Sequence, residues 1–314
     1  MKAIVLRAPG GPENFMIEEL ETPIPKQHEI LVRVKAVSVN PVDAKTRAGK
    51  ALYNSLKEDA PVILGWDIAG EVMAVGDEVP NFEVGDEVFG MVNFPGHGKA
   101  YAEYVVAPAA HLAHKPMEIS LQEAAAASLA ALTAWQVLVH QAQILPDQRV
   151  LIHAAAGGVG HFAVQIAKAF GCYVIGTASG NNYAFLRELG ADEVIDYKNE
   201  QVEEVVRNVD VVLDSLGEEN CLKSLKTLKP GGRLISIVGG AKEAVEAQAK
   251  ERKITTLNYL VHSSGKDLEQ LTDLLRDGRL KVHISHTFAF DEMPEAHRQI
   301  ETHKTRGKIV VNVE

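Results

Sequence analysis

Glycines at three closely spaced positions give this chain its clearest chemical signal. Gly157, Gly158 and Gly160 follow a short apolar run at residues 150–152 and precede a helical pattern of apolar residues. That order predicts a strand, a tight turn and a helix, with the spacing of a dinucleotide-binding fingerprint whose first position is an alanine. One glycine lets the backbone approach a pyrophosphate, another lets the helix pack on the strand, and the first N–H groups of the helix attract phosphate. An ordinary glycine-rich turn is the alternative, but the flanking strand and helix favour a phosphate site formed by Gly157, Gly158, Val159 and Gly160.

The end of the following strand indicates which dinucleotide is bound. Sites for NAD usually place an Asp or Glu there, which accepts hydrogen bonds from the ribose 2′-hydroxyl and would repel a 2′-phosphate. Residues 176–182 contain no acid, and Ser179, Asn181 and Asn182 offer small hydrogen-bond donors instead. We therefore predict NADPH as the cofactor, although no Arg or Lys lies between residues 172 and 186. Lys198 is a candidate for the missing positive charge, and a solvated surface lysine is the alternative.

The composition excludes several classes of protein. The 314 residues are enough for two domains, and 46% hydrophobic residues are enough for a full core. A net charge of −10 argues against the basic surface that nucleic-acid binding requires. Cys172 and Cys221 are the only cysteines, which argues against a disulfide scaffold and favours a reducing compartment. No apolar run reaches the roughly 18 residues of a membrane span, and the first apolar run is too short for a signal peptide, so we expect a cytoplasmic protein.

The elements that position these residues form two regions of different predicted secondary structure. Up to about residue 120 the chain shows short β-branched strands punctuated by Gly and Pro, which is typical of a barrel or a partly open sandwich. A capping box at Ser120–Glu123 then opens an Ala-rich helix, and strands alternate with helices up to a break at residues 230–232. That alternation predicts an α/β fold with a doubly wound parallel sheet. We expect strands at residues 30–39, 68–75, 87–89, 101–106, 150–152, 173–177, 193–196, 209–214, 233–238, 287–290 and 308–313.

The order of these signals resembles the medium-chain dehydrogenase/reductase superfamily over nearly the whole chain. Within it, the chain is similar to the zinc-free quinone oxidoreductases, which include zeta-crystallin and the chloroplast-envelope enone reductases. The resemblance implies a GroES-like β-barrel domain from residues 1–120 and 262–314 around a Rossmann NADP-binding domain at residues 121–261. It also implies a homodimer joined through the edges of the Rossmann sheets near residues 253–260. The segments that carry the resemblance are residues 39–43, 61–72, 84–88, 100–104, 131–134, 154–160, 189–192 and 306–310.

Further cofactor contacts follow in part from this resemblance. It places Tyr197 beside the adenosine and Thr133 near the nicotinamide, where a buried helical threonine bonded to a backbone carbonyl is the alternative. Two more pairs of residues come directly after the fourth and fifth strands of the parallel sheet, where ligands collect. Ordinary loop packing is the alternative for these pairs, which are Ser215 with Leu216 and Val238 with Gly239.

A bound metal is not expected. Zinc-dependent relatives use a Cys, a His-Glu pair and a second Cys or Asp, and the corresponding positions resemble Asn40, Trp66–Asp67 and Leu129. Zinc needs thiolate, imidazole or carboxylate ligands, which three of these four positions lack. No Cys lies between residues 1 and 171, so the four-Cys structural lobe is missing too. The pair His111 and His114 lacks a partner motif and predicts ordinary exposed or hydrogen-bonded histidines.

These observations predict an NADPH-dependent oxidoreductase that transfers hydride without a metal. The acceptor then needs little Lewis-acid help, which favours a quinone or an α,β-unsaturated carbonyl. Asn40 is the candidate donor to the substrate oxygen, Asp43 orients Asn40 or caps a helix, and Tyr53 is a candidate proton donor or stacking partner. Trp66 and Phe94 either wall the substrate pocket or belong to the core.

Two alternatives stay open from the sequence. One is a non-catalytic NADPH-binding sensor or crystallin-like protein, and the other is a zinc-free enoyl-thioester or alcohol reductase of the same superfamily. A thioester substrate would need a basic cleft for its phosphates, which the acidic charge balance disfavours.

Overall fold

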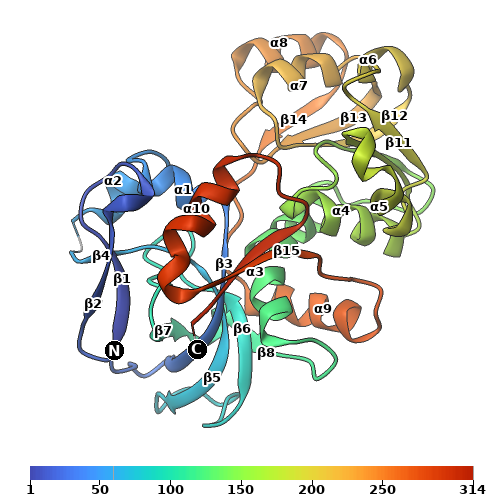
Figure 1. Ribbon diagram of the computed structural model, residues 1–314. Coiled ribbons are helices and arrows are strands. Elements are labelled where there is room, and N and C mark those ends of the chain that lie inside the picture. Colours follow the sequence, from blue (N-terminus) through green and yellow to red (C-terminus); the bar gives the residue numbers. More distant parts are fainter. Residues whose placement is uncertain (59, 314) are drawn as a thin grey trace. The chain divides into compact units, whose positions relative to one another are not determined.

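The computed structural model describes residues 1–58 and 60–313, which form two compact units (Figure 1). The first unit comprises the described parts of residues 1–132, 262–278 and 282–314, and the second comprises residues 133–261 and 279–281. The change from the first unit to the second falls inside helix α3 (Leu121–Trp135), whereas the sequence analysis placed it before residue 121. The C-terminal segment joins the first unit because its last strands add to the sheet formed by the N-terminal part.

Two sheets form the first unit. The larger has seven strands in the order β15-β16-β3-β5-β6-β8, with β7 also paired to β3, and the smaller has the order β2-β1-β4. Alternating burial along β3 places Ile30, Val32 and Val34 in the core, whereas the residues between them are only partly buried. The strands are β1 (Lys2–Leu6), β2 (Phe15–Glu19), β3 (Glu29–Val39), β4 (Val62–Ile63), β5 (Asp67–Val75), β6 (Glu87–Met91), β7 (Tyr104–Pro108), β8 (Leu112–His114), β15 (Ile284–Ala289) and β16 (Lys308–Asn312).

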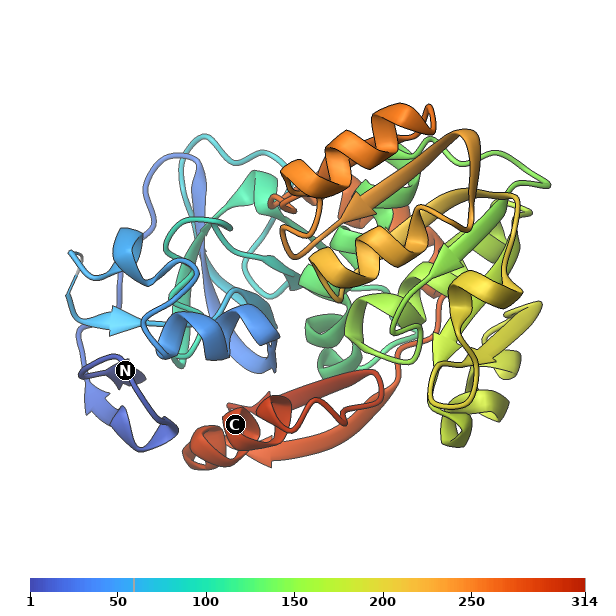
Figure 2. The same cartoon turned by 90° about the horizontal axis from the view of Figure 1, so that it is seen from above.

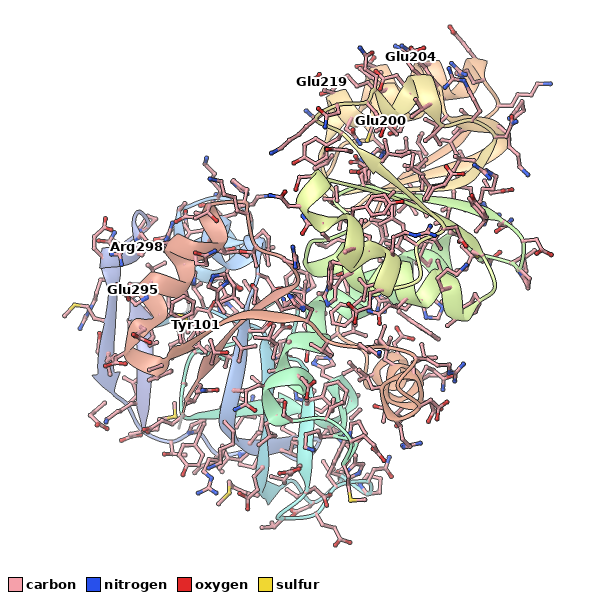
Figure 3. The ribbon with its side chains drawn as sticks, turned by 45° about the vertical axis from the view of Figure 1, so that its right-hand side comes forward. Tyr101, Glu200, Glu204, Glu219, Glu295 and Arg298 are labelled. Atoms are coloured by element: carbon pink, nitrogen blue, oxygen red, sulfur yellow. The ribbon has the colours of Figure 1, made fainter. Side chains whose placement is uncertain are left out.

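Helices of the first unit cover parts of these sheets. Helix α3 begins with the predicted capping box, since Ser120 N donates to Glu123 Oε2 at 2.9 Å and Glu123 N donates to Ser120 Oγ at 3.2 Å. Figure 2 shows α10 lying along β15 and β16. Its outer side carries an ion pair of 2.6 Å between Glu295 and Arg298 (Figure 3). The helices are α1 (Pro41–Arg47), α2 (Tyr53–Leu56), most of α3, α9 (Gly265–Arg276) and α10 (Met293–Glu301).

The second unit is built on a six-stranded parallel sheet with the order β11-β10-β9-β12-β13-β14. The strand order runs outward in both directions from β9 and β12, so the predicted α/β class with a doubly wound sheet is confirmed. Figure 1 shows α4 and α5 on one face of this sheet and α7 and α8 on the other. The strands are β9 (Arg149–Ile152), β10 (Tyr173–Ala178), β11 (Glu193–Asp196), β12 (Val209–Asp214), β13 (Leu228–Ser236) and β14 (Thr255–Asn258).

Helices and irregular turns complete this unit. The last turns after α3 form a π-helix at Gln136–Gln141, a variant that sequence periodicity does not predict. The α-helices are α4 (Gly158–Ala169), α5 (Tyr183–Glu188), α6 (Val202–Val205), α7 (Glu218–Ser224) and α8 (Glu243–Glu251). No helix in residues 1–58 or 60–313 is long and apolar enough to cross a membrane.

One predicted break in the sheet is wrong. Residues 230–232, with their Pro-Gly-Gly sequence, lie inside β13 instead of before it. The pairing register with β12 shifts between Val209, opposite Leu228, and Val211, opposite Arg233. The strand therefore absorbs the Pro and Gly residues as an irregularity, because Pro donates no ladder hydrogen bond and Gly tolerates the bend.

Candidate functional site

The glycine turn joins β9 to α4 in the second unit. Gly157 is the N-cap of α4 with φ −82° and ψ −174°, so the backbone N–H groups of the first helical turn begin directly after it. A Cβ at Gly160 would lie 2.4 Å from the carbonyl oxygen of Ala154 and 2.6 Å from Cα of Ala155. Only glycine therefore lets α4 pack this closely on the end of β9. A Cβ at Gly157 would meet only the Ala154 carbonyl at 3.2 Å, so this side of the turn is open to an approaching ligand.

The end of β10 carries the three predicted donors to a 2′-phosphate. Ser179 and Asn182 are joined by a hydrogen bond of 3.2 Å from Nδ2 to Oγ, which holds the short turn that includes Asn181. An acid that the sequence analysis did not consider lies beside them. Asp196 ends β11, pairs in register with the last residue of β10, and its Oδ2 lies 2.8 Å from where a Cβ of Gly180 would stand.

Asp196 already has donors within its own turn. Its Oδ1 accepts a hydrogen bond from the backbone N–H of Lys198 at 3.1 Å, and its Oδ2 accepts one from Asn199 Nδ2 at 2.8 Å. The sequence places Asp196 at the end of a predicted strand, residues 193–196. Only the end of the preceding strand had been searched for an acid.

A cavity of about 430 Å³ opens beside these loops in the second unit. Two predicted cofactor residues, Tyr197 and Leu216, line it, and both are more than half exposed. Glu200, labelled in Figure 3, lies on its rim together with Asn220. An exposed aromatic ring and an exposed leucine at the carboxyl ends of parallel strands are suited to hold a flat heterocycle such as adenine.

His153 forms the buried end of this cavity and was missed by the sequence analysis. Its Nε2 lies 2.8 Å from Ser224 Oγ and its Nδ1 lies 3.3 Å from Thr177 Oγ1. Because Ser224 Oγ donates to the Asn220 carbonyl at 2.8 Å, it accepts from Nε2, which fixes the proton of the imidazole there. Burial lowers the pKa of His153, so the ring is neutral and acts as a polar floor.

The loops after β12 and β13 are held by another missed residue, Asp214. Its carboxylate accepts hydrogen bonds from the backbone N–H of Gly217 at 3.0 Å, from Asn220 Nδ2 at 2.8 Å and from Ser236 Oγ at 3.1 Å. The carboxylate thereby joins the two loops that carry the predicted residues Ser215, Leu216, Val238 and Gly239. Gly239 has φ +75°, a conformation that favours glycine.

The remaining predicted cofactor residue, Thr133, is buried at 4% exposure in α3. It is the first residue of the second unit.

The candidate catalytic residues belong to the first unit, where Asn40 joins β3 to α1. Its backbone N–H donates to Asp43 Oδ2 at 2.5 Å, so the Asp43 carboxyl group caps the start of α1. Burial raises the pKa of Asp43 to about 8. Of the two roles considered for Asp43, the helix cap is the contact present in the structure. Tyr53 is the first residue of the short helix α2 and is partly exposed.

The Asn40 side chain is buried at 2% exposure and lies between two charged groups. Its Nδ2 donates to Asp67 Oδ2 at 2.8 Å, and its Oδ1 accepts from Lys308 Nζ at 2.5 Å. The second contact of Nδ2, to the carbonyl of Ser38, has a length of 3.5 Å, at the limit of a hydrogen bond. One amide proton is therefore firmly held, and the other has only a weak partner. No role was predicted for Lys308, although its segment, residues 306–310, is one of those that carry the family resemblance.

Positions that bind zinc in metal-dependent relatives do meet here. Asp67 Oδ1 accepts from the backbone N–H of Leu129 at 2.8 Å, and Oδ2 accepts from Ser38 Oγ at 2.6 Å as well as from Asn40. Lys308 Nζ lies 3.7 Å from the same Oδ2. Both oxygens of Asp67 are thus occupied by protein donors, and Lys308 stands beside them. Burial raises the pKa of Asp67 and lowers the pKa of Lys308, and the attraction between the two groups opposes both shifts. The residues present do not fit a zinc site, and no group of three His, Cys, Asp or Glu suited to a metal occurs in the described part of the chain.

Two aromatic residues near these positions belong to the core. Trp66 is fully buried, donates from Nε1 to the Gly96 carbonyl at 2.7 Å, and packs edge-on against Phe94 with ring centroids 5.2 Å apart. Packing is therefore the role that their contacts in the first unit support.

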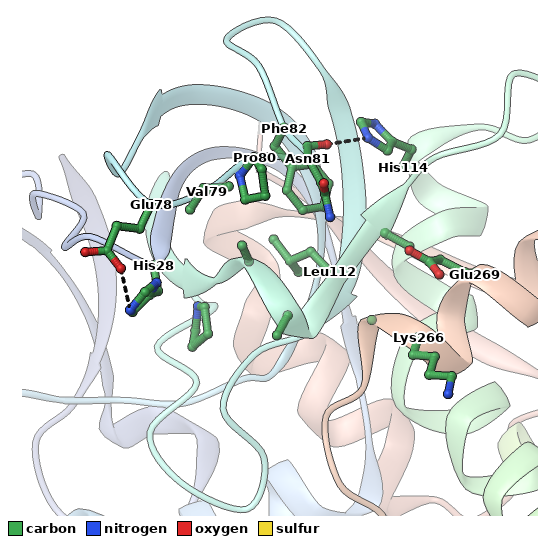
Figure 4. A pocket seen from close by; sticks show the side chains of 15 residues that line it. His28, Glu78, Val79, Pro80, Asn81, Phe82, Leu112, His114, Lys266 and Glu269 are labelled. Carbon is green, nitrogen blue, oxygen red and sulfur yellow. Dashed lines mark hydrogen bonds and ion pairs between the residues drawn. The ribbon is translucent and has the colours of Figure 1, made fainter.

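Another cavity, of about 500 Å³, lies on the first unit and is not a candidate for the reaction (Figure 4). Its two histidines have partners in the lining: His28 Nε2 lies 3.2 Å from Glu78 Oε2, and His114 Nε2 lies 3.0 Å from the Asn81 carbonyl. The ring of Phe82 packs against His114 with centroids 4.8 Å apart and ring planes inclined by 36°. None of the predicted site residues lines this cavity.

Comparisons with known proteins agree with both units. Residues 26–117 match the alcohol dehydrogenase GroES-like domain family, and residues 189–311 match the zinc-binding dehydrogenase family. The human quinone oxidoreductase is 32% identical over 96% of this chain and 94% of its own length. The chloroplastic NADPH-dependent alkenal/one oxidoreductase of Arabidopsis thaliana is 33% identical over 99% of this chain and 79% of its own length. The solved quinone oxidoreductase from Coxiella burnetii superposes with a TM-score of 0.94 at 37% identity, covering 100% of this chain and 99% of that one. A glycine turn of the dinucleotide-binding type, a GroES-like unit and full-length relatives of these kinds lead to one conclusion: the chain belongs to the medium-chain dehydrogenase/reductase superfamily and, within it, to the quinone oxidoreductase-like oxidoreductases.

Proposed function

We propose that this protein reduces quinones or α,β-unsaturated carbonyl compounds with a hydride taken from NADPH. The observation that carries the proposal is the close packing at Gly160, which places the start of α4 directly on the end of β9, and the N–H groups of such a helix start are suited to bind a phosphate. The printed activities of relatives that match nearly the whole chain, human quinone oxidoreductase and plant alkenal/one oxidoreductase, supply the substrate class.

The chain would hold the cofactor with residues of the second unit. The turn at residues 157–160 binds the pyrophosphate, and the cavity lined by Tyr197 and Leu216 takes the adenine. When bound, the nicotinamide supplies the hydride. Residues of the loops after β12 and β13 line the rest of the cofactor, and the Asp214 carboxylate keeps these loops in register.

Preference for NADPH over NADH is supported by Ser179, Asn181 and Asn182 at the end of β10. Asp196 would oppose it if its carboxylate pointed at the ribose, but this carboxylate accepts two hydrogen bonds from its own turn. Lys198, in the same turn, is the nearest candidate in the sequence for a charge that attracts the 2′-phosphate.

Asn40 would assist the reduction from the first unit. Its second amide proton has only the weak contact to Ser38, so this proton is the one available to a substrate oxygen that gains negative charge. A quinone or enone spreads that charge over a conjugated system, and one neutral donor is then adequate. The fully occupied Asp67 carboxylate supports the view that no metal takes part.

A substrate panel tests the proposal. Wild-type protein is incubated with NADPH or NADH and a quinone, an enone, an aldehyde or an enoyl thioester, and oxidation is followed at the nicotinamide absorbance band. We expect quinones or enones with NADPH to give the highest kcat/KM. Gly158→Asp is the control, because a carboxylate at the phosphate site abolishes cofactor binding. Turnover restricted to the enoyl thioester would favour the alternative of an enoyl-thioester reductase, and one structural relative is named CurK enoyl reductase. No turnover with any acceptor would contradict the proposal and favour a non-catalytic NADPH-binding protein.

We also propose a homodimer formed through the sheet edge of the second unit. Strand β14 is the edge strand, and Leu257 and Leu260 on and after it are 36% and 57% exposed. Light scattering tests the dimer, and Leu260→Glu should shift it toward the monomer. The cytoplasmic location expected from the sequence remains a proposal, because some relatives are named chloroplastic or mitochondrial.

A further inference from the structure

Lys308 is placed at Asn40 by the strand order of the first unit. Strand β16 pairs antiparallel with β3, with Ile309 opposite Val39, so Lys308 stands level with Asn40. Strand β5 pairs with the other edge of β3, with Asp67 opposite Ser38. Three adjacent strands therefore bring a cation, an amide and an anion together, although Asn40 and Lys308 are 268 positions apart in the sequence.

This arrangement leaves the Asn40 amide one orientation. A lysine ammonium only donates hydrogen bonds and an ionised carboxylate only accepts them, so the amide oxygen faces Lys308 and the nitrogen faces Asp67. The side chains of Lys308 and Asp67 are 3% and 0% exposed, which keeps water from screening their charges. A cation at the oxygen and an anion at the nitrogen fix the plane of the amide, and with it the direction of the second N–H bond.

A gain in stability does not by itself explain why the chain buries Lys308 and Asp67 together. A buried ion pair pays a large desolvation penalty, and replacing it by apolar residues of similar size is often neutral or stabilising. The first unit keeps Lys308 and Asp67 at a strand end beside the candidate donor Asn40.

We propose that Lys308 is a positioning residue for the reduction: with Asp67 it clamps the Asn40 amide and keeps its second N–H aimed at the carbonyl oxygen of a quinone or enone. The positive charge on the oxygen side also polarises the amide, so its N–H donates more strongly to an oxygen that becomes negative. The inference rests on the proposed function and adds Lys308 and Asp67 to the residues on which the rate of hydride transfer depends.

Variants that remove both charges separate positioning from stability. Lys308→Met with Asp67→Asn removes both charges and the lysine hydrogen bond, whereas Lys308→Gln with Asp67→Asn keeps polar groups without charge. A matched control is Lys115→Met with Glu87→Gln, which removes another lysine of the first unit that is 6% exposed and paired at 3.1 Å. Melting temperature, NADPH affinity, kcat, KM and the isotope effect with deuterated cofactor are measured for each protein.

We expect both neutral pairs to fold, to bind NADPH within about twofold of wild type, and to lose about tenfold or more in kcat, as expected when an electrostatic donor is misplaced. The isotope effect should rise, because hydride transfer becomes more rate-limiting. The control pair should keep wild-type kcat and isotope effect.

Two results would overturn the inference. One is wild-type kcat and isotope effect in either neutral pair, and the other is failure of both neutral pairs to fold while the control folds, which would assign the clamp to stability. A wild-type protein that reduces no quinone or enone with NADPH would instead refute the proposed function, so the two failures are distinguishable.

Discussion

Gly160 is the position where a single methyl group should do the most damage. In Gly160→Ala the new Cβ would lie 2.4 Å from the Ala154 carbonyl oxygen, and contacts below 3.0 Å essentially never occur, so the backbone must move by at least 3.0 − 2.4 = 0.6 Å. Both neighbours are backbone atoms and cannot rotate away, which puts the steric cost near the upper end of overpacking, about 3 kcal/mol. The better helix propensity of alanine returns about 1 kcal/mol, and the net loss is about 2 kcal/mol.

Thermal unfolding and cofactor titration measure this effect together. A loss of about 2 kcal/mol lowers Tm by roughly 5–10 °C in a unit of this size, and the displaced α4 should weaken NADPH binding as well. Gly157→Ala is the matched control: its φ and ψ suit alanine, and its Cβ would meet only the Ala154 carbonyl oxygen at 3.2 Å, a tight contact that a shift of a few tenths of an ångström relieves, so Tm should stay within a few degrees. Its methyl group nevertheless stands on the open side of the turn and should weaken NADPH binding about tenfold or more. Wild-type Tm in Gly160→Ala would refute the packing argument, and wild-type affinity in Gly157→Ala would refute the phosphate site.

Other perturbations test separate parts of the site. Ser179→Asp should lower kcat/KM with NADPH about tenfold or more relative to NADH, since a carboxylate there repels a 2′-phosphate; an unchanged ratio in steady-state assays would contradict the NADPH assignment. Dialysis against a chelator should leave activity intact, and elemental analysis should find no zinc. Joint loss of zinc and activity would contradict the conclusion that protein donors occupy the Asp67 carboxylate. Asn40→Ala should leave NADPH affinity nearly intact and lower kcat/KM roughly tenfold to a thousandfold; full activity on every substrate would make Asn40 purely structural. Burial and the nearby Arg47 lower the pKa of His297 to about 3, so the folded protein excludes a proton that the unfolded chain binds below about pH 6.5. The free energy of unfolding should therefore fall as the pH is lowered from about 6.5 toward 3. In denaturant titrations, His297→Gln should show a smaller change of this free energy with pH than wild type does. An equal change in the two proteins would contradict this role of His297.

The sequence predicted those features that depend on neighbours along the chain. The strand, turn and helix around Gly157, the capping box at Ser120 and the alternation that makes the parallel sheet are all local, and the structure contains each of them. The Pro-Gly-Gly at residues 230–232 shows the limit of local signals. It has the composition of a break, but the residues on either side of it, Leu228 and Arg233, both pair with β12, and this tertiary pairing keeps it within a strand.

Residues that act across the fold were harder to identify. His153 precedes the glycine turn directly, yet its partners Thr177 and Ser224 lie 24 and 71 positions away, so nothing beside it marked it as part of a cavity. Asp214 was quoted only as the last residue of a strand, and its task of joining two loops depends on parallel neighbours that meet at one end of the sheet. Asp196 was not identified because only the end of β10 was searched for an acid. The parallel neighbour β11 ends at the same side of the sheet, so its last residue lies beside the end of β10.

Lys308 gives the most instructive case, because its own segment was noticed. The Arg-Gly-Lys-Ile-Val sequence at residues 306–310 was one of the signs of the superfamily, and the missing metal ligands were identified at Asn40, Trp66–Asp67 and Leu129. These two facts are linked only by strand order, since β16 is the last strand of the chain and lies beside β3 near its start. A site that lacks a metal still has to balance the charge of the Asp67 carboxylate it buries. The absence of three zinc ligands should therefore prompt a search for a buried Lys or Arg on any strand that pairs beside them, and in this chain that search leads to Lys308.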